Sequence, residues 1–152
     1  MLKEFIKKVV NGESLSRAEA ALSMDTIMRG DATPSQIAAL LTALRIKGET
    51  IDEITGFAEK MREHATNIYP SAKNLVDTCG TGGDVSGTFN VSTVSALVAA
   101  GAGVIVAKHG NRSVSSRCGS ADLLEALGVK VDLEPKKVEE CINQVGIGFI
   151  FA

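Results

Sequence analysis

Two segments of this sequence concentrate residues that hold anions, one rich in glycine (77–93) and one rich in basic residues (108–120). Glycine lets the backbone adopt positive φ and approach a ligand closely. Consecutive backbone N–H groups then form a concave site for anions, and a helix that starts after the loop adds unpaired donors and a partial positive charge. The first segment supplies the glycines Gly80, Gly82, Gly83 and Gly87, then the polar residues Asn90, Ser92 and Thr93. It therefore predicts a phosphate-binding loop.

This loop matches neither of the common nucleotide-binding patterns. The dinucleotide fingerprint needs glycine at its first, third and sixth positions, but the sixth position counted from Gly80 is Val85. The P-loop pattern fails because Gly87 is followed by Thr88-Phe89, where lysine and a hydroxyl residue are required. An ordinary glycine turn with Asn90 as a simple N-cap remains the alternative.

The basic segment carries the cations Lys108, Arg112 and Arg117 together with Asn111 and four serines. Such donors suit an acceptor-rich ligand, most simply a polyphosphate; a solvated basic loop is the alternative. Both segments follow predicted strands, and ligands of open α/β sheets bind at the carboxyl ends of strands. We therefore expect the two segments to converge on one crevice.

The elements that position these loops differ between the two parts of the chain. Residues 1–66 predict four helices with short connections, hence a bundle. Capping-box patterns open the second helix (Ser16 with Glu19) and the fourth (Thr50 with Glu53), and Thr33-Pro34 opens the third. Glycines end the first three helices, and the fourth runs toward Thr66. The third helix is apolar on more than one face, which predicts a central position. Residues 67–74 are a linker.

From residue 75 onward, short apolar runs alternate with helices, which indicates an α/β domain with a largely parallel sheet over 75–152. The expected strands are 75–77, 103–107 and 147–151, and the expected helices are 90–100, 121–127 and 135–145. The chain stops at Ala152, directly after an apolar strand. We therefore expect a sheet that is incomplete at its C-terminal end.

Composition excludes several classes of function. The net charge of −2, the aromatic content of 4% and the absence of Trp argue against a nucleic-acid partner. No apolar run approaches the roughly 20 residues needed to cross a membrane, and no signal peptide is recognisable. Cys79, Cys118 and Cys141 are odd in number and lack histidines at ligand spacing, so we expect reduced thiols, no zinc site and a cytoplasmic location. No His-plus-carboxylate pair is recognisable near Cys79 or Cys118, so neither is expected to be a nucleophile.

The two loops also carry a family resemblance. The segments DTCGTGGD (77–84), GTFNVST (87–93), KHGNRSVSS (108–116) and CGSADLLEALG (118–128) resemble the signature segments of anthranilate phosphoribosyltransferases. The resemblance extends over essentially the whole chain, including its helical start. Pyrimidine nucleoside phosphorylases share the architecture, but their corresponding segments differ, so they are a more distant alternative.

The resemblance implies a reaction and a set of substrate contacts. Members of the family transfer the phosphoribosyl group of phosphoribosyl pyrophosphate (PRPP) to the amine of anthranilate in tryptophan biosynthesis, releasing pyrophosphate with the help of Mg²⁺. The resemblance implies that Ser92 is a magnesium ligand and that Lys108 stabilises the leaving group and substrate. It also implies that Gly80 and Asn111 contact anthranilate. The implied pyrophosphate contacts are Gly80, Gly83, Asp84, Thr88, Asn90, Val91, Ser92 and Thr93. The implied phosphoribosyl contacts are Lys108, His109, Gly110, Asn111, Arg112, Ser113, Val114, Ser115, Ser116 and Ser120.

The resemblance also implies a homodimer formed through the N-terminal helices, and it sets a limit. Members of the family continue for roughly as many residues again, which supply an arginine for the anthranilate carboxylate and an Asp-Glu pair for a second magnesium ion. We therefore expect the isolated 152-residue chain to be inactive or weakly active. The alternative is a non-catalytic half-enzyme module that needs a partner chain.

Overall fold

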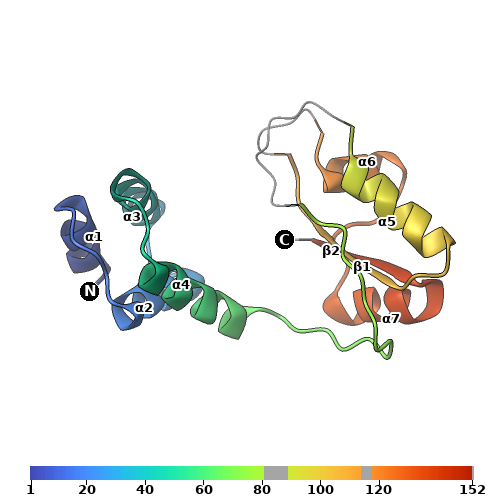
Figure 1. The fold of residues 1–152 in the computed structure, drawn as a ribbon, viewed down its shortest axis with the longest axis horizontal. Helices are drawn as coiled ribbons and strands as arrows, with labels where there is room; N and C mark the ends of the chain where they lie inside the picture. Colours follow the sequence, from blue (N-terminus) through green and yellow to red (C-terminus); the bar gives the residue numbers. More distant parts are fainter. Residues whose placement is uncertain (81–88, 114–117, 152) are drawn as a thin grey trace. The chain divides into compact units, whose positions relative to one another are not determined.

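A computed structural model describes residues 1–80, 89–113 and 118–151 of the chain. The chain divides into two compact units, Met1–Ala65 and Thr66–Ala152 (Figure 1). No helix within the described ranges is long and apolar enough to cross a membrane.

The first unit contains the four predicted helices: α1 (Leu2–Val10), α2 (Arg17–Met28), α3 (Pro34–Lys47) and α4 (Ile51–His64). The capping boxes predicted at the starts of α2 and α4 are both confirmed. A third, formed by Thr33 and Gln36, opens α3. In each box the side chain and the backbone exchange hydrogen bonds, so two otherwise unpaired N–H groups are satisfied and the helix start is fixed.

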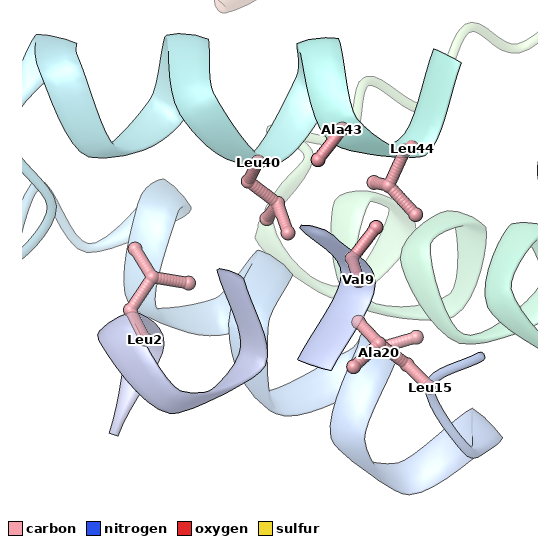
Figure 2. Packing of buried hydrophobic residues seen from close by; sticks show 7 residues of the cluster. All are labelled: Leu2, Val9, Leu15, Ala20, Leu40, Ala43 and Leu44. Carbon is pink, nitrogen blue, oxygen red and sulfur yellow. The ribbon is translucent and has the colours of Figure 1, made fainter. Parts of the chain in front are cut away.

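The core of this unit forms where α3 packs on α1, and Figure 2 shows Leu40, Ala43 and Leu44 of α3 directed toward Val9 of α1. The prediction that α3 is central is wrong for this unit, because Leu41 is 51% exposed and Ile46 is 82% exposed. The reason is the pairing of the helices: α3 packs mainly against α1, while α2 packs against α4, so only one face of α3 is covered.

Helices α2 and α4 approach closely at Gly56. A Cβ atom at Gly56 would lie only 2.3 Å from the carbonyl oxygen of Arg17, so only glycine fits this crossing. His64, in the last turn of α4, contacts the neighbouring helix α2, with its Nε2 atom 2.8 Å from Oδ1 of Asp25.

Glu53 is a fully buried carboxylate that ties three parts of this unit together. It accepts hydrogen bonds from the backbone N–H groups of Leu15 (2.8 Å) and Thr50 (2.7 Å) and from Nζ of Lys47 (2.9 Å). Burial raises the pKa of Glu53, but these bonds to Lys47, Thr50 and Leu15 together outweigh burial and leave its pKa below the ordinary value.

The second unit contains α5 (Val91–Gly101), β1 (Val106–Gly110), α6 (Ser120–Ala126), α7 (Pro135–Val145) and β2 (Ile147–Phe151). The two strands pair in parallel, with Val106 opposite Ile147 and Gly110 opposite Phe151, which confirms the predicted parallel pairing. The strand predicted at 75–77 is reduced to one isolated parallel bridge between Val76 and Val106. That bridge lies on the edge of β1 opposite β2. Val76 bonds Ile105, just before β1, and Ala107, whereas Val106 bonds Gly146 on the other side.

The position of β1 corrects another prediction. A strand was expected at 103–107, but Gly103 and Val104 complete the turn out of α5, where Gly103 has a φ of +91° and donates to the carbonyl of Ala100. The strand therefore begins at Val106 and extends through Gly110. Lys108 and His109, which were expected in the loop after the strand, lie within the strand itself.

The predicted linker packs against the second unit. Backbone N–H groups of Tyr69 and Ser71 donate to the side chains of Glu139 and Asn143 on α7, both at 2.8 Å.

Candidate functional site

The residues after Val76, the start of α5 and the residues before α6 meet at one place. The hydroxyl of Thr78 donates to the carbonyl of Ser92 at 2.6 Å. The side chain of Asn90 donates to the carbonyl of Cys118 at 3.1 Å. The glycine-rich and basic segments therefore converge, as their positions after strands predicted.

The start of α5 carries four of the predicted pyrophosphate contacts, Asn90, Val91, Ser92 and Thr93. Asn90 occupies the N-cap position, but it makes no capping hydrogen bond and instead bridges to the second segment. Ser92 is half-buried. Thr93 is 1% exposed, and its hydroxyl has no hydrogen-bond partner among the residues that the structure describes. A buried hydroxyl without a partner costs free energy, so this position favours a ligand that accepts or donates there.

Lys108 and His109 lie on opposite faces of β1, because side chains alternate along a strand. Lys108 is 3% exposed, and its ammonium donates to the carbonyl of His109 at 2.5 Å. It also lines a cavity of about 150 Å³ together with Thr93 and mostly apolar side chains of α5, α6, α7 and β2. Within the described ranges no carboxylate pairs with Lys108. A buried ammonium without a counter-ion is costly, so this position suits an anionic ligand.

Arg112 is in a different electrostatic situation. Its guanidinium contacts Glu125 at 2.7 Å and Asp122 at 3.1 Å, both from α6, and lies 5.7 Å from the ring centre of Phe151. Glu125, and then Asp122, raise the pKa of Arg112, and Arg112 lowers the pKa of Glu125 in return. Its charge is therefore compensated within the chain.

Asp122 is a positioning residue that the sequence analysis did not identify. Its Oδ2 atom accepts hydrogen bonds from the N–H groups of Gly119 (2.7 Å) and Ser113 (3.1 Å). These two bonds, with that from Arg112, hold the pKa of Asp122 below its ordinary value. The available signal was an acidic residue three positions after the residue that opens a helix, a place where carboxylates bond the helix start.

Gly110 and Gly119 are required by close packing. A Cβ atom at Gly110 would lie 2.9 Å from Cβ of Ser120, and one at Gly119 would lie 2.4 Å from the backbone nitrogen of Ser113. Asn111 lies between them, with its carbonyl accepting from Ala121 at 3.2 Å. Gly80, in contrast, has open space where its side chain would be. Val91 is exposed.

The surroundings of Cys79 differ from the sequence analysis, in which no histidine and carboxylate were recognisable near this thiol. The Sγ atom of Cys79 lies 3.3 Å from Nδ1 of His109, and Asp77 completes a group in which one ligand atom from each residue lies within 4.8 Å of the others. A histidine and a carboxylate therefore do lie beside Cys79. Linear spacing concealed them, because thirty residues separate Cys79 from His109.

Six of the predicted contacts lie outside the described residues: Gly83, Asp84, Thr88, Val114, Ser115 and Ser116. The remaining ones all lie in the segments that meet around the start of α5, the end of β1 and the start of α6.

A helical bundle followed by an α/β unit that carries a glycine-rich and a basic segment is the architecture of a known protein family. Residues 3–65 match the glycosyl transferase family, helical bundle domain, and residues 72–152 match the glycosyl transferase family, a/b domain. The chain belongs to this family.

Individual relatives and solved structures in this family are similar to the chain over nearly its whole length. The chain is 64% identical over 152 residues to an anthranilate phosphoribosyltransferase of Pelotomaculum thermopropionicum, covering 100% of the chain and 44% of that relative. The crystal structure of anthranilate phosphoribosyltransferase from Thermus thermophilus aligns with a TM-score of 0.83 at 49% identity, covering 97% of this chain and 45% of that one. The anthranilate phosphoribosyltransferase of Saccharomyces cerevisiae in complex with PRPP and Mg aligns with a TM-score of 0.82 at 26% identity, covering 99% and 46%.

These matches confirm the resemblance found in the sequence. They also show that the chain spans less than half the length of the relatives that it matches.

Proposed function

We propose that the protein containing this chain transfers the phosphoribosyl group of PRPP to the amine of anthranilate and releases pyrophosphate. The observation that supports this most strongly is the 64% identity, over the whole chain, to the anthranilate phosphoribosyltransferase of Pelotomaculum thermopropionicum. The convergence of the glycine-rich and basic segments gives it a physical basis. Breaking the bond to pyrophosphate builds negative charge on the leaving group, and fixed donors aimed at that charge lower the barrier.

The described residues fit distinct parts of this task. The side chains of Ser92 and Thr93, at the positive end of α5, receive the pyrophosphate. Lys108 supplies a buried positive charge beside Thr93. Asn90 holds the two segments together through its bond to Cys118. No strong base is needed, because an aromatic amine is a neutral nucleophile at pH 7.

Mg²⁺ belongs to the same proposal, and the residues present fit it. Magnesium is held in many phosphate sites by one or two protein oxygens plus substrate phosphates. Ser92 offers a hydroxyl oxygen in the first turn of α5, half-buried and next to the predicted pyrophosphate site. The ion would neutralise charge on the leaving pyrophosphate, while the chain's own donors fix its orientation. A cytoplasmic location and little or no turnover by the 152-residue chain alone are further parts of the proposal.

Calorimetry of the complete protein with PRPP and Mg²⁺ tests the binding step. Uptake of PRPP is expected, and no uptake in the presence of Mg²⁺ would contradict the proposal. A transfer assay with PRPP and anthranilate tests the reaction. Replacing these with phosphate and a pyrimidine nucleoside distinguishes a transferase from a nucleoside phosphorylase.

We also propose that the protein is a homodimer through its N-terminal helices. A groove of about 500 Å³ between α1 and α3 is lined largely by apolar residues that include Val9, Val10 and Ala39. Ile46 at its edge is 82% exposed. Apolar surface of this kind on a small helical unit is typical of an interaction face.

A matched pair of substitutions tests this interface. Ile46→Glu is expected to convert the dimer to a monomer in light scattering, because a charge would be buried without a partner. Ile51→Glu is the control, since Ile51 is 84% exposed on α4 and does not line the groove. A monomeric unmodified protein, or a dimer that tolerates Ile46→Glu, would exclude this interface.

A further inference from the structure

We propose that Asp77, Cys79 and His109 form a binding site for a thiophilic divalent metal ion of the zinc class. One ligand atom from each residue lies within 4.8 Å of the other two. Sγ of Cys79 and Nδ1 of His109 are 3.3 Å apart. Tetrahedral zinc with ordinary bond lengths separates a sulfur and a nitrogen ligand by about 3.5 Å. The thiol and the imidazole are therefore already at the spacing of a shared ion.

The backbone holds the three residues in this arrangement. His109 lies on β1, and Asp77 directly follows Val76, which is bridged to Val106 of the same strand. Oδ1 of Asp77 accepts hydrogen bonds from the N–H groups of Cys79 (2.9 Å) and His109 (3.3 Å). These bonds fix the orientation of the carboxylate beside the other two side chains. Ligands fixed in this way lose little conformational freedom on binding a metal.

The ligand set selects the metal. A thiolate with an imidazole and a carboxylate suits zinc, whereas magnesium prefers oxygen ligands. The site is therefore chemically different from the magnesium position proposed at Ser92. Three protein ligands leave a fourth position for water or another small ligand. Asp77 and Cys79 are exposed, so an ion reaches them directly. Binding deprotonates the thiol and releases its proton to the solvent.

Cobalt is the probe, because Co²⁺ replaces zinc and gives a thiolate-to-metal absorption band in the near ultraviolet. Titration of the reduced protein with Co²⁺ is expected to give this band with a stoichiometry of one ion per chain. Zn²⁺ should remove the band at equimolar concentration, and Mg²⁺ in large excess should leave it unchanged. One proton per bound Zn²⁺ should be released in unbuffered solution.

Substitutions assign the band to the proposed ligands. Cys79→Ser should abolish it, and His109→Gln should weaken Co²⁺ binding by more than about tenfold, since even the loss of an indirect ligand contact costs that much. Cys118→Ser and Cys141→Ser should retain both the band and its affinity. Circular dichroism confirms that each variant is folded. Absence of the band from the unmodified protein, or its persistence in Cys79→Ser, would overturn the proposal. Either result leaves the transferase proposal intact, because no substrate is present.

Discussion

Replacing Lys108 by Met should stabilise the protein, although most substitutions in a protein interior destabilise it. Lys108 is 3% exposed, and among the described residues its ammonium has one hydrogen-bond partner, the carbonyl of His109. An unpaired buried ion costs several kcal/mol, and one hydrogen bond from a charged group returns about 1.5–3 kcal/mol. The difference predicts that Lys108→Met raises the free energy of unfolding by about 1–3 kcal/mol, because Met fills similar space without the charge.

Urea unfolding followed by amide hydrogen exchange of residues 91–110 measures this change. A local signal is needed because the chain has two compact units, whose transitions would overlap in a global signal. Lys130→Met is the matched control: Lys130 lines the same cavity but is exposed, so its effect should stay within about 0.5 kcal/mol. A destabilised Lys108→Met protein would show that the ammonium is not an uncompensated charge.

The same position should behave in the opposite way in function. In the complete enzyme, Lys108→Ala should cost on the order of 2–4 kcal/mol of transition-state stabilisation, as the loss of one charge-directed donor does elsewhere. The loss is measured as kcat/KM for PRPP. A gain in stability together with a loss of activity would identify a residue kept for its ligand. An unchanged rate would count against the proposed role.

Three further predictions concern the supports of the site and the helical unit. Glu53→Ala should lower the free energy of unfolding of the first unit by about 3–5 kcal/mol, because it leaves Lys47 buried without its carboxylate partner. The control Glu63→Ala, at an exposed ion pair, should lower it by less than about 1 kcal/mol. Equal losses for the two variants in urea unfolding would refute the reasoning. Because the folded pKa of Glu53 lies below its ordinary 4.5, its contribution should be complete above pH 4.5 and disappear as the pH falls through the folded pKa; denaturation midpoints between pH 7 and pH 3 should show this fall, and Glu53→Gln should flatten it. Gly119→Ala should cost about 1–3 kcal/mol through a backbone clash, whereas Gly101→Ala, a helical position with open space, should be neutral or stabilising in the same thermal assay.

Local signals in the sequence were sufficient for the helices. Ser16 and Thr50 each precede an acidic residue by three positions, and this pattern alone locates the starts of α2 and α4. The same pattern identified only part of the role of Glu53. Its bond to Thr50 is local, but its bond to Leu15 spans thirty-eight residues and depends on how the helices pack.

The start of β1 and the cluster of Asp77, Cys79 and His109 were not predictable either, because both depend on contacts between segments distant in the sequence. The apolar run that begins at Gly103 satisfies a strand pattern, yet its first two residues turn the chain out of α5. Pairing with Ile147–Phe151 then fixes the strand at Val106–Gly110. His109 lies in this strand and beside Cys79, and neither residue's neighbours in the sequence indicate that contact.

The cations of the basic segment, counted together in the sequence, separate into different roles in the fold. Arg112 is neutralised by Glu125 and Asp122, so its described position holds the start of the second loop against α6. Lys108 has no carboxylate partner within the described ranges and is buried beside Thr93, whose hydroxyl also lacks a partner there. Unsatisfied charge and unsatisfied hydrogen-bonding capacity thus coincide at Lys108 and Thr93, so recognition of an anion by the described residues depends on this pair more than on Arg112.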